Sequence, residues 1–163
     1  MTSKRLNAEV LVYKKLLANG DIQATYQALV GIVQHLRTYF KKKYKDNFSI
    51  AAVLHGYIDF TYFYLQNESL KKRKLKFAVV LNHKNANFEL WLLGQTKEVQ
   101  KSYWEKLKDL KWVNQMTMPE YSIFEVTLLD NPDFDNPKKL LEAIANSFDS
   151  LSSEILVALN AAK

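Results

Sequence analysis

The chain has 163 residues, of which 48% are hydrophobic and 25% charged, the usual composition of a globular protein with one hydrophobic core. It contains no cysteine, which excludes disulfides and thiolate metal sites, and no run approaches the roughly 18 apolar residues of a membrane span. We therefore expect a single domain over residues 1–163. The first residues have no apolar signal-peptide region, which favours a cytoplasmic protein without a membrane partner.

The net charge of +6 is unevenly distributed. Residues 1–112 hold 20 lysines and arginines against 9 aspartates and glutamates, whereas residues 113–163 hold 3 against 8. Such asymmetry is found in proteins with an anionic partner, but it also allows an acidic C-terminal helix to pack beside a basic body. We favour the second interpretation and keep nucleic-acid binding through the basic N-terminal two-thirds as an alternative function.

Two helices are predicted at the N-terminus. Leu6, Val10, Tyr13 and Leu17 recur at a spacing of three and four, which predicts a helix over about residues 6–18. The pair Asn19-Gly20 ends it, and Asp21 caps a longer second helix. The apolar positions of this second helix are Ile22, Tyr26, Leu29, Val33, Leu36, Phe40 and Tyr44. We expect a helical hairpin whose apolar stripes face each other or the sheet.

Residues 55–65, HGYIDFTYFYL, are the most aromatic segment and are predicted as one strand. Alternation along it puts the following residues on one face: Gly56, Ile58, Phe60, Tyr62 and Tyr64. The opposite face receives the remaining alternating residues: His55, Tyr57, Asp59, Thr61 and Phe63. Residues 49–54 either extend this strand or form a separate short element. Residues 66–74, which contain the run KKRK, are predicted as a charged loop.

A hairpin is predicted over residues 75–94, with residues 83–86 as its loop. A four-residue loop places Asn82 opposite Asn87 and pairs Val80 with Glu89. That register gathers the fully apolar positions of both strands on one face: Leu75, Phe77, Val79, Leu81, Phe88, Leu90 and Leu92. A loop one residue longer or shorter would send one set to the wrong side, so pattern and loop length support each other.

The last third alternates between helices and a strand. Gly94 ends the second hairpin strand, and Thr96 is the predicted N-cap of an amphipathic helix that reaches Leu110. Residues 111–119 are predicted to be irregular and residues 121–129 to form a fourth strand. Asn136 and Pro137 open a long final helix. Its apolar stripe consists of Leu140, Ile144, Phe148, Leu151, Ile155 and Leu159. The predicted fold is α+β: about four mainly antiparallel strands, with helices largely on one face.

The polar faces of the predicted strands form the candidate site. The residues we expect to bind a ligand there are His55, Tyr57, Asp59, Lys76, Glu89, Trp91 and Glu125. Thr61, Asn82 and Thr127 share this face. Aromatic rings supply contact area and charged groups supply orientation, so the set suits a small polar ligand. The alternative is that this face is only solvated, because an antiparallel sheet covered on one side has a polar outer side.

Two alternative chemistries use the acids and the histidines of the chain. Asp59 and Glu89 with a lysine on a neighbouring strand resemble the acids of metal-dependent nucleases or hydrolases, which hold a divalent cation. In the usual arrangement acid and lysine lie two apart on one strand, but here Trp91 occupies that position. His35, His55 and His83 indicate no metal site, and four glycines form no phosphate-binding loop. We therefore expect no metal and no cofactor.

Three segments carry a resemblance to a known family: HGYIDFTYFYL, NFELWLLGQTKEVQKSYW, and NPDFDN before the last helix. On these the chain resembles, over nearly its whole length, an uncharacterised family of small bacterial cytoplasmic proteins, a domain of unknown function. The resemblance implies a bacterial origin and no particular activity or functional residue. The function we expect is a non-enzymatic module that binds a small polar ligand or a protein partner on the polar-aromatic face of its sheet.

Overall fold

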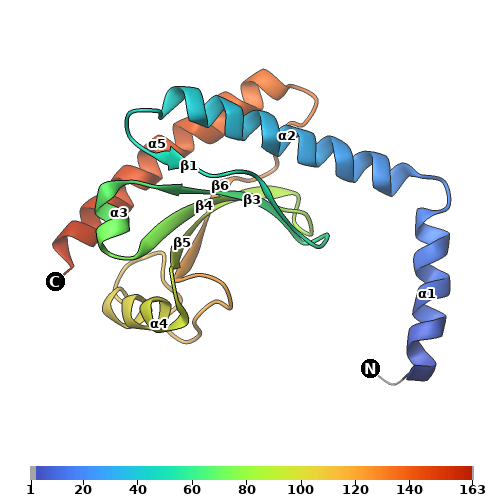
Figure 1. The fold of residues 1–163 in the computed structure, drawn as a ribbon, viewed down its shortest axis with the longest axis horizontal. Coiled ribbons are helices and arrows are strands. Elements are labelled where there is room, and N and C mark those ends of the chain that lie inside the picture. Colours follow the sequence, from blue (N-terminus) through green and yellow to red (C-terminus); the bar gives the residue numbers. More distant parts are fainter. Residues whose placement is uncertain (1–2, 163) are drawn as a thin grey trace. The chain divides into compact units, whose positions relative to one another are not determined.

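The computed structural model describes residues 3–162, which form five helices and a six-stranded antiparallel sheet (Figure 1). The helices are α1 (Ser3–Leu17), α2 (Asp21–Lys43), α3 (Glu68–Lys72), α4 (Lys97–Lys106) and α5 (Pro137–Ala161). The strands are β1 (Ser49–Ile50), β2 (Leu54–Gly56), β3 (Phe60–Gln66), β4 (Leu75–Asn82), β5 (Asn87–Gly94) and β6 (Phe124–Leu129). The predicted α+β class is confirmed, with two short strands more than expected.

The chain divides into two compact units, Met1–Ile32 and Val33–Lys163, with the boundary inside α2. In the first unit, α1 ends as predicted: Gly20 has φ +82°, and the Asp21 N–H donates to Asn19 Oδ1 at 3.2 Å. The apolar stripe of α1 is exposed, with 51% of Leu6 and 62% of Tyr13 accessible. The predicted burial of this stripe in a helical hairpin is therefore wrong, although both helices are present.

The second unit contains the sheet, whose strand order is β1, β3, β4, β5, β6. β2 also pairs with β3, on the same edge as β1, so residues 49–56 form two short strands rather than one long one. The β4–β5 hairpin has the predicted register, with Asn82 opposite Asn87 and Val80 opposite Glu89. Its apolar face is buried as predicted.

The predicted single strand over residues 55–65 is wrong, because residues 57–59 form a turn between β2 and β3. Gly56 pairs with Phe60, and the Asp59 N–H donates to the Gly56 carbonyl at 3.1 Å. The Asp59 carboxylate accepts the Phe60 N–H at 2.7 Å, as turn aspartates often do. Tyr57 takes a left-handed conformation with φ 42° to close the turn.

The turn keeps the predicted grouping of faces, because His55 pairs with Thr61 and Gly56 with Phe60, and paired residues share a face. Thr61, Phe63 and Leu65 of β3 are fully buried. Phe60, Tyr62 and Tyr64 point to the opposite face and remain partly exposed. The predicted faces of this segment are therefore exchanged: the face expected to be covered is open, and the face expected to be open is covered.

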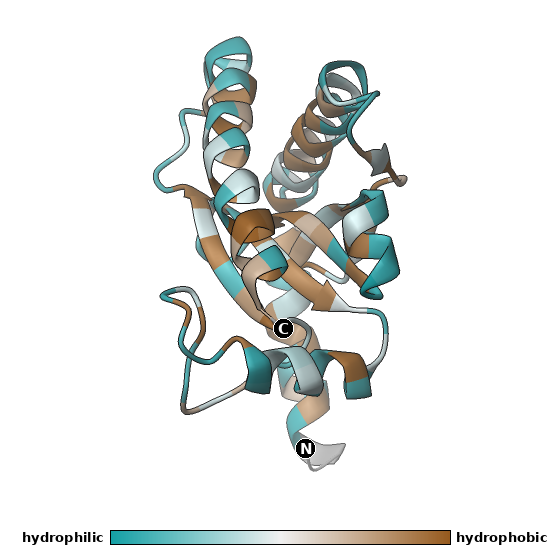
Figure 2. Ribbon diagram, turned by 90° about the vertical axis from the view of Figure 1, so that its left-hand side faces the viewer, coloured by the Kyte–Doolittle hydropathy of each residue, from teal (hydrophilic) through white to brown (hydrophobic). Residues whose placement is uncertain are grey.

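The covered face of the sheet is packed by α5 and by the part of α2 that follows Val33. Phe40 of α2, Phe63 of β3 and Phe148 of α5 are fully buried. The Phe40 ring lies 5.6 Å from the Phe63 ring and 5.1 Å from the Phe148 ring, in the edge-on and tilted arrangements that aromatic pairs prefer. Hydrophobic residues accordingly run along the strands in Figure 2. This is the main core of the molecule.

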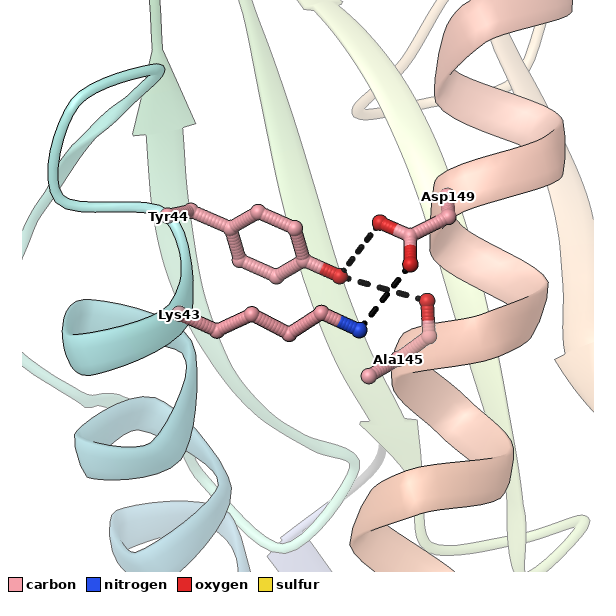
Figure 3. Close-up of polar contacts among 4 residues, drawn as sticks. All are labelled: Lys43, Tyr44, Ala145 and Asp149. Atoms are coloured by element: carbon pink, nitrogen blue, oxygen red, sulfur yellow. Dashed lines mark hydrogen bonds and ion pairs between the residues drawn. The ribbon is translucent and has the colours of Figure 1, made fainter.

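A polar contact ties the end of α2 to α5 (Figure 3). The Tyr44 hydroxyl shares its proton between Asp149 Oδ1 at 2.7 Å and the Ala145 carbonyl at 3.2 Å. Lys43 Nζ lies 3.0 Å from the second oxygen of Asp149. Burial and the adjacent Asp149 carboxylate raise the pKa of Tyr44, so the hydroxyl stays protonated and donates at physiological pH.

The remaining helices are short and capped. Helix α3 lies where a loop was predicted; the Asn67 side chain accepts the Leu70 N–H at 2.8 Å, and Leu70 is fully buried. Thr96 caps α4 as predicted, but the helix ends at Lys106 rather than at Leu110. In Figure 1, α5 and α4 lie on opposite sides of the sheet, so α4 covers part of the second face.

Candidate functional site

The open face of the sheet contains a cavity of about 350 Å³. Its lining consists of residues from β2, β3, β4, β5 and two loops: Gly56, Tyr57, Asp59, Phe60, Tyr62, Tyr64, Lys76, Ala78, Trp91, Leu93, Gly94 and Tyr121. The volume lies within the range of roughly 300–1,000 Å³ that is usual for small-molecule sites. Half of the lining residues are thus aromatic, and the cavity is large enough for a small organic molecule.

The strand register explains why a cavity forms here. Tyr64 of β3 lies opposite Ala78 of β4, and Ala78 lies opposite Trp91 of β5. The smallest side chain in this row thus stands between two large rings, and cross-strand neighbours on one face lie only about 5 Å apart. The rings of Phe60 and Tyr62 pack against the same small cluster. The result is a depression with a floor at Ala78 and aromatic walls.

Trp91 is held rigidly in this wall. Its indole N–H donates to Glu89 Oε2 at 2.7 Å, and the Asn82 side-chain amide donates to Glu89 Oε1 at 3.2 Å. Phe60 packs edge-on against the Trp91 ring, with 4.9 Å between ring centroids. Both carboxylate oxygens of Glu89 are therefore engaged, and the side chain is only 8% exposed. Glu89 orients the tryptophan rather than facing the cavity.

Lys76 supplies the positive charge of the cavity. Its Nζ lies 3.6 Å from the centroid of the Tyr64 ring, a cation–π contact. Among residues 3–162, no carboxylate lies within ion-pairing distance of this ammonium. Partial burial lowers the pKa of Lys76. Burial, together with the neighbouring Tyr62, raises the pKa of Tyr64 to about 12, so Tyr64 stays neutral beside the lysine.

The mouth of the cavity is formed by Tyr57, Asp59 and Tyr121. Tyr57 is 95% exposed and Tyr121 53% exposed. The nearby Glu120 carboxylate raises the pKa of Tyr121, and Asp59 and Tyr57 add smaller effects in the same direction. The two exposed tyrosines thus lie near each other at the solvent edge, on separate loops.

Four of the seven predicted ligand-binding residues line this cavity: Tyr57, Asp59, Lys76 and Trp91. The other three are elsewhere. His55 is exposed on β2 and pairs with Thr61, so it belongs to the covered face of the sheet. Glu89 lies behind Trp91. Glu125 lies on β6 opposite Trp91 of β5. Its carboxylate points to Ser122, whose hydroxyl donates to it at 2.9 Å.

The sequence prediction missed Phe60, Tyr62, Tyr64 and Tyr121. The first three share a face with Gly56, as predicted, but that face is open and not covered by the helices. A signal for the correct faces was present, since Phe63 and Leu65 are fully apolar whereas Tyr62 and Tyr64 carry hydroxyl groups. A hydroxyl favours the side that keeps contact with water. Tyr121 precedes β6 in a loop, and no sequence pattern connects it to the sheet.

The described residues offer neither a metal cluster nor a membrane-spanning helix. Among residues 3–162, no three histidine, aspartate or glutamate side chains converge as they would around a metal ion. Within the same range, no helix combines the length and apolar character needed to cross a bilayer. The two acids that a metal-dependent hydrolase would use accept hydrogen bonds from their own surroundings. Asp59 accepts the Phe60 N–H in the β2–β3 turn, and Glu89 on β5 accepts the Trp91 indole N–H.

Comparison with known proteins adds the family. No curated protein and no solved structure is significantly similar to this chain. Residues 6–159 match a family that is described as a domain of unknown function, so the match runs from α1 to the end of α5. The match confirms the resemblance to a domain of unknown function. The chain therefore belongs to the family named Domain of unknown function DUF7000.

Proposed function

We propose that this protein is a non-enzymatic cytoplasmic module that binds a small polar ligand in the aromatic cavity on the open face of its sheet. The observation that carries the proposal is the cavity itself, about 350 Å³ in volume and walled by Tyr62, Tyr64 and Trp91. Binding sites for small molecules combine such apolar walls with a few fixed polar groups. Lys76 and Asp59 are the charged groups of the lining, and its tyrosines add hydroxyl groups.

The site is proposed to be preformed because hydrogen bonds hold the tryptophan of its wall in place. Trp91 is held by Glu89, and Glu89 by Asn82, so a ligand would not have to order this ring on binding. Binding that requires little ordering of side chains loses less free energy to conformational entropy. A protein partner that inserts one side chain into the same cavity remains the alternative occupant.

No observation favours a second function. A metal-dependent hydrolase would need free carboxylate oxygens, but both oxygens of Glu89 accept hydrogen bonds from Trp91 and Asn82. For nucleic acid, the lining of the cavity contains one cation, Lys76, and an exposed carboxylate, Asp59. A phosphate backbone is bound through several cations that release counterions together.

The test is a thermal-shift screen of small aromatic and polar compounds against the wild type and Tyr62→Ala. We expect compounds that stabilise the wild type to lose their effect on Tyr62→Ala, because the substitution removes one wall. The matched control is Tyr103→Ala, which removes a partly exposed tyrosine from α4, outside the cavity lining. If every stabilising compound acts equally on all three proteins, the cavity is not the binding site.

A further inference from the structure

We infer that the ligand of this cavity is an aromatic carboxylate, whose ring lies between Tyr62, Tyr64 and Trp91 and whose carboxylate contacts Lys76 Nζ. The inference rests on the proposed function and adds the chemical class of the ligand. Binding of a small molecule in the cavity is one property, and a negative charge on that molecule is a second one. The experiment below tests them separately.

The negative charge follows from the surroundings of Lys76. Its ammonium group is partly removed from water and contacts the face of the Tyr64 ring. Among the residues that the structure describes, no acid neutralises it within ion-pairing distance. A cation that loses water without gaining a counter-charge is costly, whereas adding the counter-charge recovers favourable electrostatic energy. An anionic group on the ligand would therefore improve binding at this position.

A carboxylate fits better than a phosphate. Lys76 is the only lysine or arginine among the described residues that line the cavity, so one positive charge is available. Phosphate carries close to two charges and is usually bound by several donors or by a helix N-terminus. The lining has no helix N-terminus, because its residues come from strands β2 to β5 and from loops. A single charge on the protein is matched by a single charge on the ligand.

Asp59 sets the direction in which the ligand enters. It precedes Phe60, which pairs with Asn82, six residues along β4 from Lys76. At about 3.4 Å per residue this corresponds to roughly 20 Å along the strand, so the acid and the lysine stand at opposite ends. Asp59 repels a carboxylate at its own end. The charged group of the ligand is thus directed to Lys76 and the uncharged part toward the mouth.

The aromatic part follows from the walls. Tyr62 and Tyr64 have ring centroids 5.4 Å apart, and Phe60 meets Trp91 edge-on. The floor between them is Ala78, which offers no polar side-chain atom. Aromatic rings gain about 0.5–1.5 kcal/mol from such arrangements beyond the area they bury. A planar ring therefore uses this surface better than a flexible polar chain does.

The experiment compares acids with their neutral amides: phenylacetate with phenylacetamide, and 4-hydroxyphenylacetate with its amide. Affinities are measured by isothermal titration calorimetry at pH 7. For the wild type we expect each acid to bind at least about tenfold more tightly than its amide, the factor expected for a charge-assisted hydrogen bond. Lys76→Met should remove this ratio while amide binding persists, and Lys76→Arg should keep it.

The matched control is Lys101→Met, which removes the same charge from an exposed position on α4. It should keep the acid-to-amide ratio of the wild type. If acids and amides bind equally to the wild type, or if Lys76→Met keeps the ratio, the anionic ligand class is wrong while small-molecule binding at the cavity stands. If none of the acids and amides binds, the inference fails as well, and the thermal-shift screen decides the proposed function independently.

Discussion

The two faces of the sheet are built from the same strands but differ in what closes them. On one face, Phe63, Phe77 and Phe148 belong to a core sealed by α5 and the second half of α2. On the other face, Tyr62, Tyr64 and Lys76 keep contact with solvent. Adjacent residues of one strand, such as Tyr62 and Phe63, thus serve opposite purposes. Stability and binding can therefore be altered separately, by substitutions one residue apart.

The largest expected effect is on the covered face. Phe148→Ala removes a fully buried ring that contacts Phe40, Tyr44 and Phe77. Phenylalanine-to-alanine changes in cores cost about 3–5 kcal/mol. We expect chemical denaturation to show a loss of that size. Tyr62→Ala on the open face should cost markedly less, because Tyr62 is already partly exposed; equal losses would mean that both faces are core.

The next effect concerns the support behind the cavity wall. Glu89→Leu leaves the Trp91 indole N–H and the Asn82 amide without their acceptor. An unsatisfied buried polar group costs about 1–3 kcal/mol, and we expect urea denaturation to show a loss in that range. Trp91 should also lose its fixed orientation. Glu142→Leu is the control, since Glu142 is exposed on α5, away from the open face; a similar loss in both variants would contradict a special role for Glu89.

A smaller effect depends on pH. The pKa of Tyr64 is raised from 10.0 to about 12 by burial and by Tyr62, so the folded state holds its proton more tightly than the unfolded state. The stability this gives is fully present below pH 10 and is lost as the pH rises through about 12. Tyr64→Phe should flatten the decline between these values in urea denaturation. An unchanged decline would show that Tyr64 is not shielded from water.

The smallest effect is expected at the cap of α4. Thr96→Ala removes the acceptor of the Val99 N–H, a bond of 3.2 Å at an exposed helix end. Loss of such a cap costs about 1 kcal/mol. We expect thermal denaturation to show this modest loss and ligand binding to remain unchanged. A change in affinity would indicate that α4 helps to shape the cavity.

The strands and the register of the β4–β5 hairpin could be predicted from the sequence alone. Both strands carry an uninterrupted apolar set, and the four-residue loop admits one register that buries both sets. Patterning and turn length are local properties, so they could be combined without knowing the rest of the fold. The Thr96 cap was predictable for the same reason, and so was the start of α5 at Pro137, although the Asn136 side chain makes no capping hydrogen bond.

Two features could not be predicted in this way. The turn at residues 57–59 is made of Tyr57, Ile58 and Asp59, and two of these residues favour strands. The bonds of Asp59 to Gly56 and Phe60 are local, but the turn is also held by the His83 N–H, which donates to the Asp59 carbonyl at 2.9 Å, and this contact is tertiary. The turn leaves Phe60, Tyr62 and Tyr64 on one face, as alternation predicts. Alternation groups the residues of a strand but does not say which group the helices cover, and here the prediction chose the wrong group. The exposed stripe of α1 is the second: periodicity indicates an apolar face but not a partner for it.

The central claim is that ligands bind at the wall formed by Trp91. The chain has three tryptophans, and only Trp91 lines the cavity, whereas Trp104 and Trp112 do not. Their indole N–H groups give separate signals in a ¹H–¹⁵N NMR spectrum. On titration with phenylacetate, the account predicts a progressive shift of the Trp91 signal while the other two stay in place. Shifts at Trp104 or Trp112 with an unmoved Trp91 signal would contradict it.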